Sequence, residues 1–196
     1  YNISNTNKLD SVIRYMFDNI GNETSLRNIE RELKSFGYSV SAPTIDTYLK
    51  GLLDSYLLYK CDQYDIKGKR ILNTNSKYYV ADIGLRNAIL NNSDRDFGHI
   101  LENVVYLELI RRGYKVNVGK CYNAEVDFVA TKNNTVEYYQ VALNVLNIDT
   151  LERELASLEK IKNNYPKFLL TTDLGEGENN GIKRINVFDW LLNKIQ

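Results

Sequence analysis

The chain has 196 residues, and its 43 % hydrophobic content is enough for one large domain or two small ones. Its 25 basic residues balance its 25 acidic residues, so the chain lacks the strong positive charge of many nucleic-acid-binding domains. No segment reaches the roughly 18 consecutive apolar residues of a membrane span, and two cysteines are too few for a disulfide framework, so we expect a soluble cytoplasmic protein without a membrane partner.

Three amphipathic helices are predicted at the start of the chain. Apolar side chains recur at helical spacing in residues 9–20. Ser25 can cap a second helix, which Gly37 ends. Ser41 can cap a third helix, which carries Pro43 in its first turn, where the missing N–H costs little.

A β-hairpin is predicted next. Two aromatic-rich strands, Tyr56–Tyr59 and Lys77–Val80, are separated by the polar stretch Asp62–Ser76. Three helices followed by a hairpin form a winged helix-turn-helix, to which we assign residues 1–92. In that motif the third helix faces the DNA major groove and the hairpin contacts phosphates. The candidate DNA-binding residues are Thr44, Thr47 and Lys50 on the helix and Lys67, Lys69 and Arg70 on the hairpin.

The rest of the chain, residues 93–196, is predicted to form a second domain that mixes helices and strands. An apolar helix over Gly98–Arg112 comes first. The elements expected after it are strands at 115–118, 125–130 and 135–141, a helix capped by Thr150, a buried strand at 167–172, a strand at 185–188 and a last helix. Trp190, Leu191 and Leu192 of that last helix are expected to pack on the core.

Two carboxylates in the second predicted strand of this domain suggest a cation site. Residues two apart in a strand share a face, so Glu125 and Asp127 should lie together, with Val126 and Phe128 on the other face. Carboxylate oxygens suit a hard cation such as Mg²⁺. In a metal-dependent nuclease the next strand adds an acid and a lysine at Glu-x-Lys spacing, and here Gln140 and Ala142 hold those places.

This order of elements resembles the PD-(D/E)XK nuclease superfamily, which implies an αβββαβ domain with a mixed central sheet. The whole chain is similar to the C-terminal region of a group of prokaryotic AAA-type ATPases, in which a winged helix precedes a nuclease-like domain of unknown function. The segments that carry the resemblance are Ser76–Asn87, Gly98–Leu109, Glu125–Phe128 and Glu152–Leu155.

The resemblance implies an ATPase core upstream, and since the chain begins with Tyr1 rather than methionine we expect a piece cut from a longer protein. No G-x-x-x-x-G-K-[ST] loop occurs in the sequence, so ATP hydrolysis does not reside in this chain.

The resemblance also implies roles for four residues. Glu102 matches the helix carboxylate of the superfamily and Asp127 its metal-binding aspartate, while Gln140 replaces the following acid and Ala142 the lysine. Alanine cannot orient a water or stabilise phosphoryl charge, so the catalytic set is degenerate. A weak Mg²⁺ site of Glu102, Asp127 and Gln140 remains open, as does replacement of the lost lysine by Lys120 or Lys167.

The leading interpretation is therefore a DNA-associated accessory region of an AAA-type ATPase, with a catalytically impaired nuclease-like domain used for binding or docking. Two alternatives stay open. One is an active metal-dependent DNA nuclease. The other is a module that binds only protein, because many winged helices do so and the chain's 15 tyrosines suit mixed polar and apolar contacts.

Overall fold

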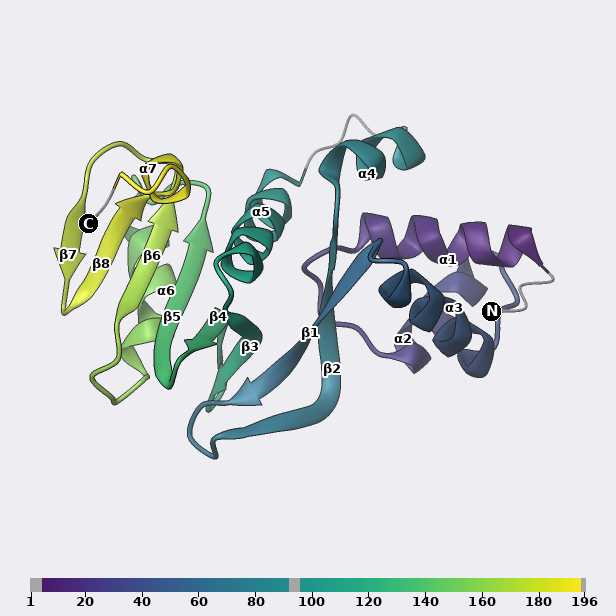
Figure 1. Ribbon diagram of the computed structural model, residues 1–196, viewed down its shortest axis with the longest axis horizontal. Helices are drawn as coiled ribbons and strands as arrows, with labels where there is room; N and C mark the ends of the chain where they lie inside the picture. Colours follow the sequence, from purple (N-terminus) through teal and green to yellow (C-terminus); the bar gives the residue numbers. More distant parts are fainter. Residues whose placement is uncertain (1–4, 92–95, 195–196) are drawn as a thin grey trace. The chain divides into compact units, whose positions relative to one another are not determined.

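The computed structural model describes residues 5–91 and 96–194 and divides into two compact units (Figure 1). Unit 1 consists of residues 1–61 and 74–95, and unit 2 of residues 62–73 and 96–196. Residues 62–73, here called the distal hairpin, are assigned by the sequence pattern to the first domain. In the structure they group with unit 2, because β1 (Leu58–Asp65) joins the sheet of that unit.

Unit 1 contains the three expected helices, α1 (Thr6–Asp18), α2 (Leu26–Ser35) and α3 (Ala42–Asp54). The side chain of Ser25 caps α2 as expected, accepting a hydrogen bond of 3.3 Å from the backbone N–H of Asn28. The three helices bury one apolar core, whose members include Val12, Met16, Phe17, Ile29, Leu33, Ile45 and Leu49. The segment between α1 and α2 forms an antiparallel bridge, in which Thr24 pairs with Ser76.

A fourth helix, α4 (Ile83–Leu90), is absent from the sequence prediction. Its one fully buried residue is Arg86, which donates from Nε to the backbone oxygen of Phe17 at 2.7 Å. Asp82 caps the helix through the N–H of Leu85. Because the one fully buried residue of α4 is an arginine, apolar periodicity alone does not indicate this helix.

The hairpin strands are much longer than the sequence suggests. β1 spans Leu58–Asp65 and β2 spans Arg70–Val80, so most of the stretch expected to be a polar loop is strand. The far half of β1 pairs in parallel with β3 (Lys115–Cys121), with Gln63 opposite Val118. This pairing gives polar residues of β1 backbone partners that lie far away in the sequence.

Unit 2 is an α/β structure with a mixed sheet, as expected. Its further strands are β4 (Ala124–Lys132), β5 (Thr135–Ala142), β6 (Lys167–Thr171), β7 (Gly177–Asn179) and β8 (Ile182–Asn186). The strand order is β2-β1-β3-β4-β5-β6-β8-β7. β4 is antiparallel to β3 and β5, whereas β6 is parallel to β5 and β8.

Helices cover both faces of this sheet (Figure 1). On one face α5 (Phe97–Arg111) places Tyr106 against Phe128, and α7 (Val187–Leu191) places Trp190 against Tyr139. On the other face α6 (Ile148–Glu159) packs on a cluster that includes Val129, Tyr138, Leu155, Leu158 and Leu169. β6 is buried between the two helix layers, which confirms the expected central parallel strand.

Several boundaries in unit 2 differ from the prediction. Asn147 rather than Thr150 caps α6, because its side chain accepts from the N–H of Asp149 at 2.8 Å. β7 forms in a stretch expected to be a loop, and β8 begins three residues earlier than predicted. Trp190 is buried as expected, but Leu192 lies beyond the end of α7 and is exposed. None of the helices in the described ranges is both long and apolar enough to cross a membrane.

Candidate functional site

A β-bulge in β4 shapes the surroundings of Asp127. Asn117 of β3 pairs with Val129 and Gly119 pairs with Val126, so two residues of β4 lie opposite one residue of β3. As a result Val126 joins Val129 in the cluster under α6, while Phe128 packs against α5. The prediction that Val126 and Phe128 share a face is therefore wrong, because simple alternation does not continue through a bulge.

The side chain of Asp127 bonds to the backbone of the neighbouring strand. Regular pairing of β4 with β5 begins at the pair of Phe128 and Tyr139. Asp127, one residue earlier in β4, instead bonds through its side chain, because its Oδ2 accepts the N–H of Val141 at 2.8 Å. Asp127 is almost fully buried. A buried carboxylate that accepts a backbone N–H helps to hold the two strands together at the bulge.

Gln140 links Asp127 to helix α6. Its Oε1 accepts from the backbone N–H of Asp127 at 3.3 Å and from the hydroxyl of Ser157 at 3.2 Å. Its Nε2 donates to Oε2 of Glu154 at 3.0 Å. The amide oxygen and one N–H are therefore already engaged with the protein, and a carboxylate at this position would face the carboxylate of Glu154.

The other two places taken from the nuclease resemblance are Glu102 and Ala142. Glu102 is a buried residue of α5, which covers one face of the sheet. The residues that bind the side chain of Gln140 belong to α6, on the other face. Ala142 packs against the apolar cluster under α6. In residues 5–91 and 96–194, no three or more His, Cys, Asp or Glu side chains are grouped to hold a metal ion. The structure thus joins Asp127 to Gln140 by a hydrogen bond.

The two lysines considered as replacements have other partners. Nζ of Lys120 lies 2.7 Å from Oε2 of Glu125, and both side chains are about 30 % exposed. Nζ of Lys167 donates to the backbone oxygen of Asn163 at 2.9 Å. Burial lowers the pKa of Lys167, and the ammonium of Lys162 lowers it further.

The candidate DNA-binding residues of α3 are mostly engaged with their own helix. Oγ1 of Thr47 donates to the backbone oxygen of Pro43 at 3.0 Å. Thr44 shares a hydrogen bond of 2.9 Å with Ser41, and Lys50 forms an ion pair of 2.6 Å with Asp46. An exposed ion pair of this kind is weak, but the carboxylate of Asp46 offsets the charge of Lys50, which is the one basic residue that α3 has for a phosphate.

The basic side chains of the hairpin tip, residues 66–70, are exposed to solvent. Lys67, Lys69 and Arg70 are all exposed. The nearby acid Asp65 accepts the backbone N–H groups of Lys67 and Gly68 through Oδ1, at 3.1 and 2.9 Å. Its other oxygen is 3.9 Å from Nε of Arg70, a long contact that leaves the guanidinium 74 % exposed. The tip therefore offers three long basic side chains to solvent.

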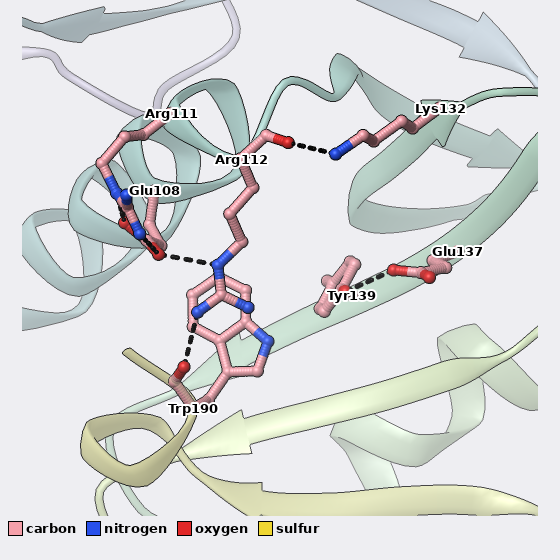
Figure 2. A network of polar contacts seen from close by, with 7 residues as sticks. All are labelled: Glu108, Arg111, Arg112, Lys132, Glu137, Tyr139 and Trp190. Carbon is pink, nitrogen blue, oxygen red and sulfur yellow. Dashed lines mark hydrogen bonds and ion pairs between the residues drawn. The ribbon is translucent and has the colours of Figure 1, made fainter. Parts of the chain in front are cut away.

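A polar cluster at the end of α5, which sequence analysis missed, fixes the last helix (Figure 2). Glu108 accepts from Arg111 at 2.6 and 2.7 Å and from Nε of Arg112 at 2.6 Å. The guanidinium of Arg112 stacks 4.0 Å from the ring centre of Trp190 and donates to the backbone oxygen of that residue at 2.5 Å. Trp190 lies 78 residues further along the chain, so no local pattern could reveal the contact.

The ionisation of this cluster follows from its contacts. The hydrogen bond from Arg111 has the largest effect on Glu108 and holds the pKa of its carboxyl below the ordinary value, with Arg112 adding to the effect. Burial raises the pKa of Tyr139, whose hydroxyl donates to Oε2 of Glu137 at 2.6 Å. A pocket of about 280 Å³ lies beside these groups and is lined in part by Arg112, Glu137 and Tyr139.

A larger groove, of about 650 Å³, lies within unit 1 between α1 and α2. Tyr15 and Thr24 line it together with two aromatic residues that follow α2, Phe36 and Tyr38. Phe36 is 67 % exposed and Tyr38 is 49 % exposed. Exposed aromatic side chains beside a groove are a feature of protein-binding surfaces.

Comparison with known proteins finds relatives without an assigned function. Residues 1–96 match a domain of unknown function, DUF8612. An uncharacterized protein of Haemophilus influenzae is 41 % identical over 191 residues, which are 97 % of this chain and 47 % of the relative. The uncharacterized protein MJ1544 of Methanocaldococcus jannaschii is 35 % identical over 164 residues, or 82 % of this chain and 36 % of the relative. The chain spans less than half the length of these curated relatives.

Proposed function

We propose that this chain is a DNA-associated accessory region of an AAA-type ATPase, and that its nuclease-like half serves as a binding or docking platform rather than as a nuclease. The observation that carries the DNA part of this proposal is the exposed hairpin tip with Lys67, Lys69 and Arg70. Long basic side chains on an exposed turn reach phosphates without reading the base sequence.

The architecture of each unit supports the proposal. In unit 1 three helices precede the hairpin, and the segment between α1 and α2 pairs with β2 through the bridge of Thr24 and Ser76. This arrangement fits a winged helix. In unit 2 the order α5, β3, β4, β5, α6, β6 fits the αβββαβ order of PD-(D/E)XK domains.

The contacts of Gln140 and Ala142 support a role without cleavage. The amide of Gln140 is bonded to the backbone N–H of Asp127, to Ser157 and to Glu154, so its oxygen already has two protein donors and position 140 supplies no carboxylate of its own. Ala142 packs on apolar side chains and cannot supply an ammonium to the attacking water. Asp127 is itself bonded to the backbone of Val141. These contacts are those of a packed sheet rather than of an open metal site.

The ATPase part of the proposal concerns the portion of the relatives that this chain does not match. More than half of each uncharacterized relative lies outside the region that this chain matches. An ATPase core could occupy part of that length. Purification of the full-length relative from H. influenzae and measurement of its ATP hydrolysis, with and without DNA, would test the assignment.

The DNA part is tested by replacing Lys67, Lys69 and Arg70 with alanine. We expect the triple variant to bind duplex DNA more weakly by a similar factor for every sequence, with a flatter dependence on salt, because each basic side chain that no longer binds a phosphate takes close to one unit from the log–log slope. Fluorescence anisotropy at ~50 mM salt and above measures both quantities.

The matched control is the double variant Thr47→Ala with Lys50→Ala on α3, which should change nonspecific binding less because Lys50 is already paired with Asp46. If the parent protein does not bind duplex at ~50 mM salt, where electrostatic binding is strong, the DNA proposal fails.

A second candidate function is a protein-interaction module, favoured by the groove of unit 1 and its exposed residues Phe36 and Tyr38. This candidate predicts that Phe36→Ser with Tyr38→Ser abolishes association with a partner and leaves DNA binding unchanged.

A further inference from the structure

A groove beside an exposed tyrosine lies next to the hairpin tip, within unit 2. Tyr122 occupies the two-residue turn between β3 and β4 and is 70 % exposed. Nζ of Lys67 lies 4.8 Å from the centre of its ring. The groove, of about 410 Å³, is lined by Tyr122 and by residues at the end of α6: Ala156, Glu159, Lys160 and Lys162.

Positive charge predominates around this groove. Lys67 lies on one side of Tyr122, and Lys160 and Lys162 line the groove. Among the described residues, none of these three ammonium groups takes part in an ion pair with an acid. Two acids of this region have other hydrogen-bond partners. Asp65 accepts backbone N–H groups of the hairpin tip, and Glu159, which lines the groove, accepts from Nδ2 of Asn180 at 2.8 Å.

An exposed aromatic ring among lysines is the combination that binds single-stranded nucleic acid. Base stacking on aromatic side chains and phosphate contacts by lysines together give affinity that depends little on sequence. A duplex keeps its bases stacked inside, so it offers the ring of Tyr122 no free base face. An unpaired base does offer one, and the volume of the groove is within the range of small-molecule sites.

We propose that Tyr122 is a stacking platform for an unpaired base of single-stranded DNA, whose phosphates are bound by Lys67, Lys160 and Lys162. This inference rests on the proposed function in that DNA is the ligand, and it adds the form of the DNA and a second contact surface. The side chain of Lys67 joins the two surfaces, because it belongs to the hairpin tip and lies over the ring of Tyr122.

The test compares a fluorescein-labelled oligo(dT) of about 16 nucleotides, the upper length covered by one small binding domain, with a blunt duplex of equal length. We expect the parent protein to bind the single strand more tightly than the duplex. Tyr122→Leu should weaken single-strand binding about tenfold and leave duplex binding unchanged, since stacking of one base contributes about this factor. Tyr122→Phe should bind like the parent, because it keeps the ring.

The chain offers a closely matched control in Tyr56. Tyr56 is 71 % exposed and has a φ of 56°, against 70 % and 55° for Tyr122, but it belongs to unit 1. Tyr56→Leu therefore imposes the same chemical change on a similar backbone and should not alter single-strand binding. The double variant Lys160→Gln with Lys162→Gln should reduce the salt slope for single strands by about 1.4, or about 0.7 for each phosphate that is no longer neutralised.

The outcomes separate this inference from the proposed function. If the parent binds duplex through the hairpin tip but Tyr122→Leu binds single strands as well as the parent does, the inference is overturned and the proposed function stands. If the parent binds neither form of DNA, both fail. If the parent protein binds phosphatidylserine vesicles but not oligonucleotides, both the inference and the proposed function are also overturned. Thermal unfolding followed by tryptophan fluorescence verifies that each variant is folded.

Discussion

Replacement of Arg112 by alanine should release the last helix from the core of unit 2. Arg112 is the link in the cluster of Figure 2, because its Nε donates to Glu108 while its guanidinium stacks on Trp190 and donates to the backbone oxygen of that residue. Its side chain is only 21 % exposed, so these contacts are largely shielded from water. Arg111 binds the same carboxylate but is 64 % exposed, which makes it a matched control.

The expected cost of Arg112→Ala follows from these contacts. The stacking on Trp190 contributes about 1 kcal/mol, since the pair is partly desolvated. The hydrogen bond from a charged donor to the carbonyl oxygen contributes about 2 kcal/mol. Without them the free energy of unfolding should fall by about 3 kcal/mol. Arg111→Ala should cost clearly less than Arg112→Ala, because its exposed ion pair is screened by water.

The single tryptophan of the chain makes the assay specific. Trp190 is that tryptophan, so its fluorescence reports on the contact itself. For a chain of this size about 3 kcal/mol corresponds to a fall in Tm of about 6–12 °C, and the fall for Arg111→Ala should be clearly smaller. Equal losses in the two variants would refute the reasoning, because they would assign the stability to Glu108 alone rather than to the contact with Trp190.

Three further predictions concern unit 2. The purified protein should not cleave plasmid DNA with Mg²⁺ or Mn²⁺, and cleavage that disappears in Asp127→Ala would contradict this. Gln140→Glu should lower the free energy of unfolding at pH 7 by about 1–3 kcal/mol, because it sets a carboxylate about where Nε2 now lies 3.0 Å from Glu154. Since that repulsion raises the pKa of the new carboxyl, the loss should shrink as the pH falls; a loss that does not change with pH would argue against it. The pKa of Glu108 is held below its usual 4.5, so its contribution to stability is complete above about pH 4.5 and is lost as the pH falls through the lowered value. The Tm of Glu108→Gln should therefore fall less steeply than that of the parent protein below pH 4.5. An unchanged dependence of Tm on pH in this range would contradict the role assigned to Glu108.

Much of the secondary structure could be predicted from local pattern. The helices α1, α2, α3 and α5 appear within a few residues of their expected bounds, because apolar periodicity and caps such as Ser25 are local properties. The helix α4 escaped prediction because a buried arginine, Arg86, attaches it. Polar contacts of this kind leave no periodic signal in the sequence.

The contacts around Asp127 and Gln140 could not be predicted from the sequence. The resemblance to nucleases predicts that Gln140 and Ala142 stand where an active enzyme would have an acid and a lysine. It does not indicate that Gln140 binds Ser157 and Glu154 of α6, since those contacts require the helix to pack across the sheet. Nor does it show the bulge that places Val126 and Phe128 on opposite faces.

The sequence by itself therefore determined the helices α1, α2, α3 and α5 and the central buried strand, all of which depend on residues close together in the chain. Only the tertiary structure decided that the distal hairpin belongs to unit 2 and that Arg112 fixes Trp190. The physical reason is that a strand edge or a guanidinium can form hydrogen bonds with many different partners. Which partner it takes depends on packing between segments distant in sequence, as in the parallel pairing of Gln63 with Val118.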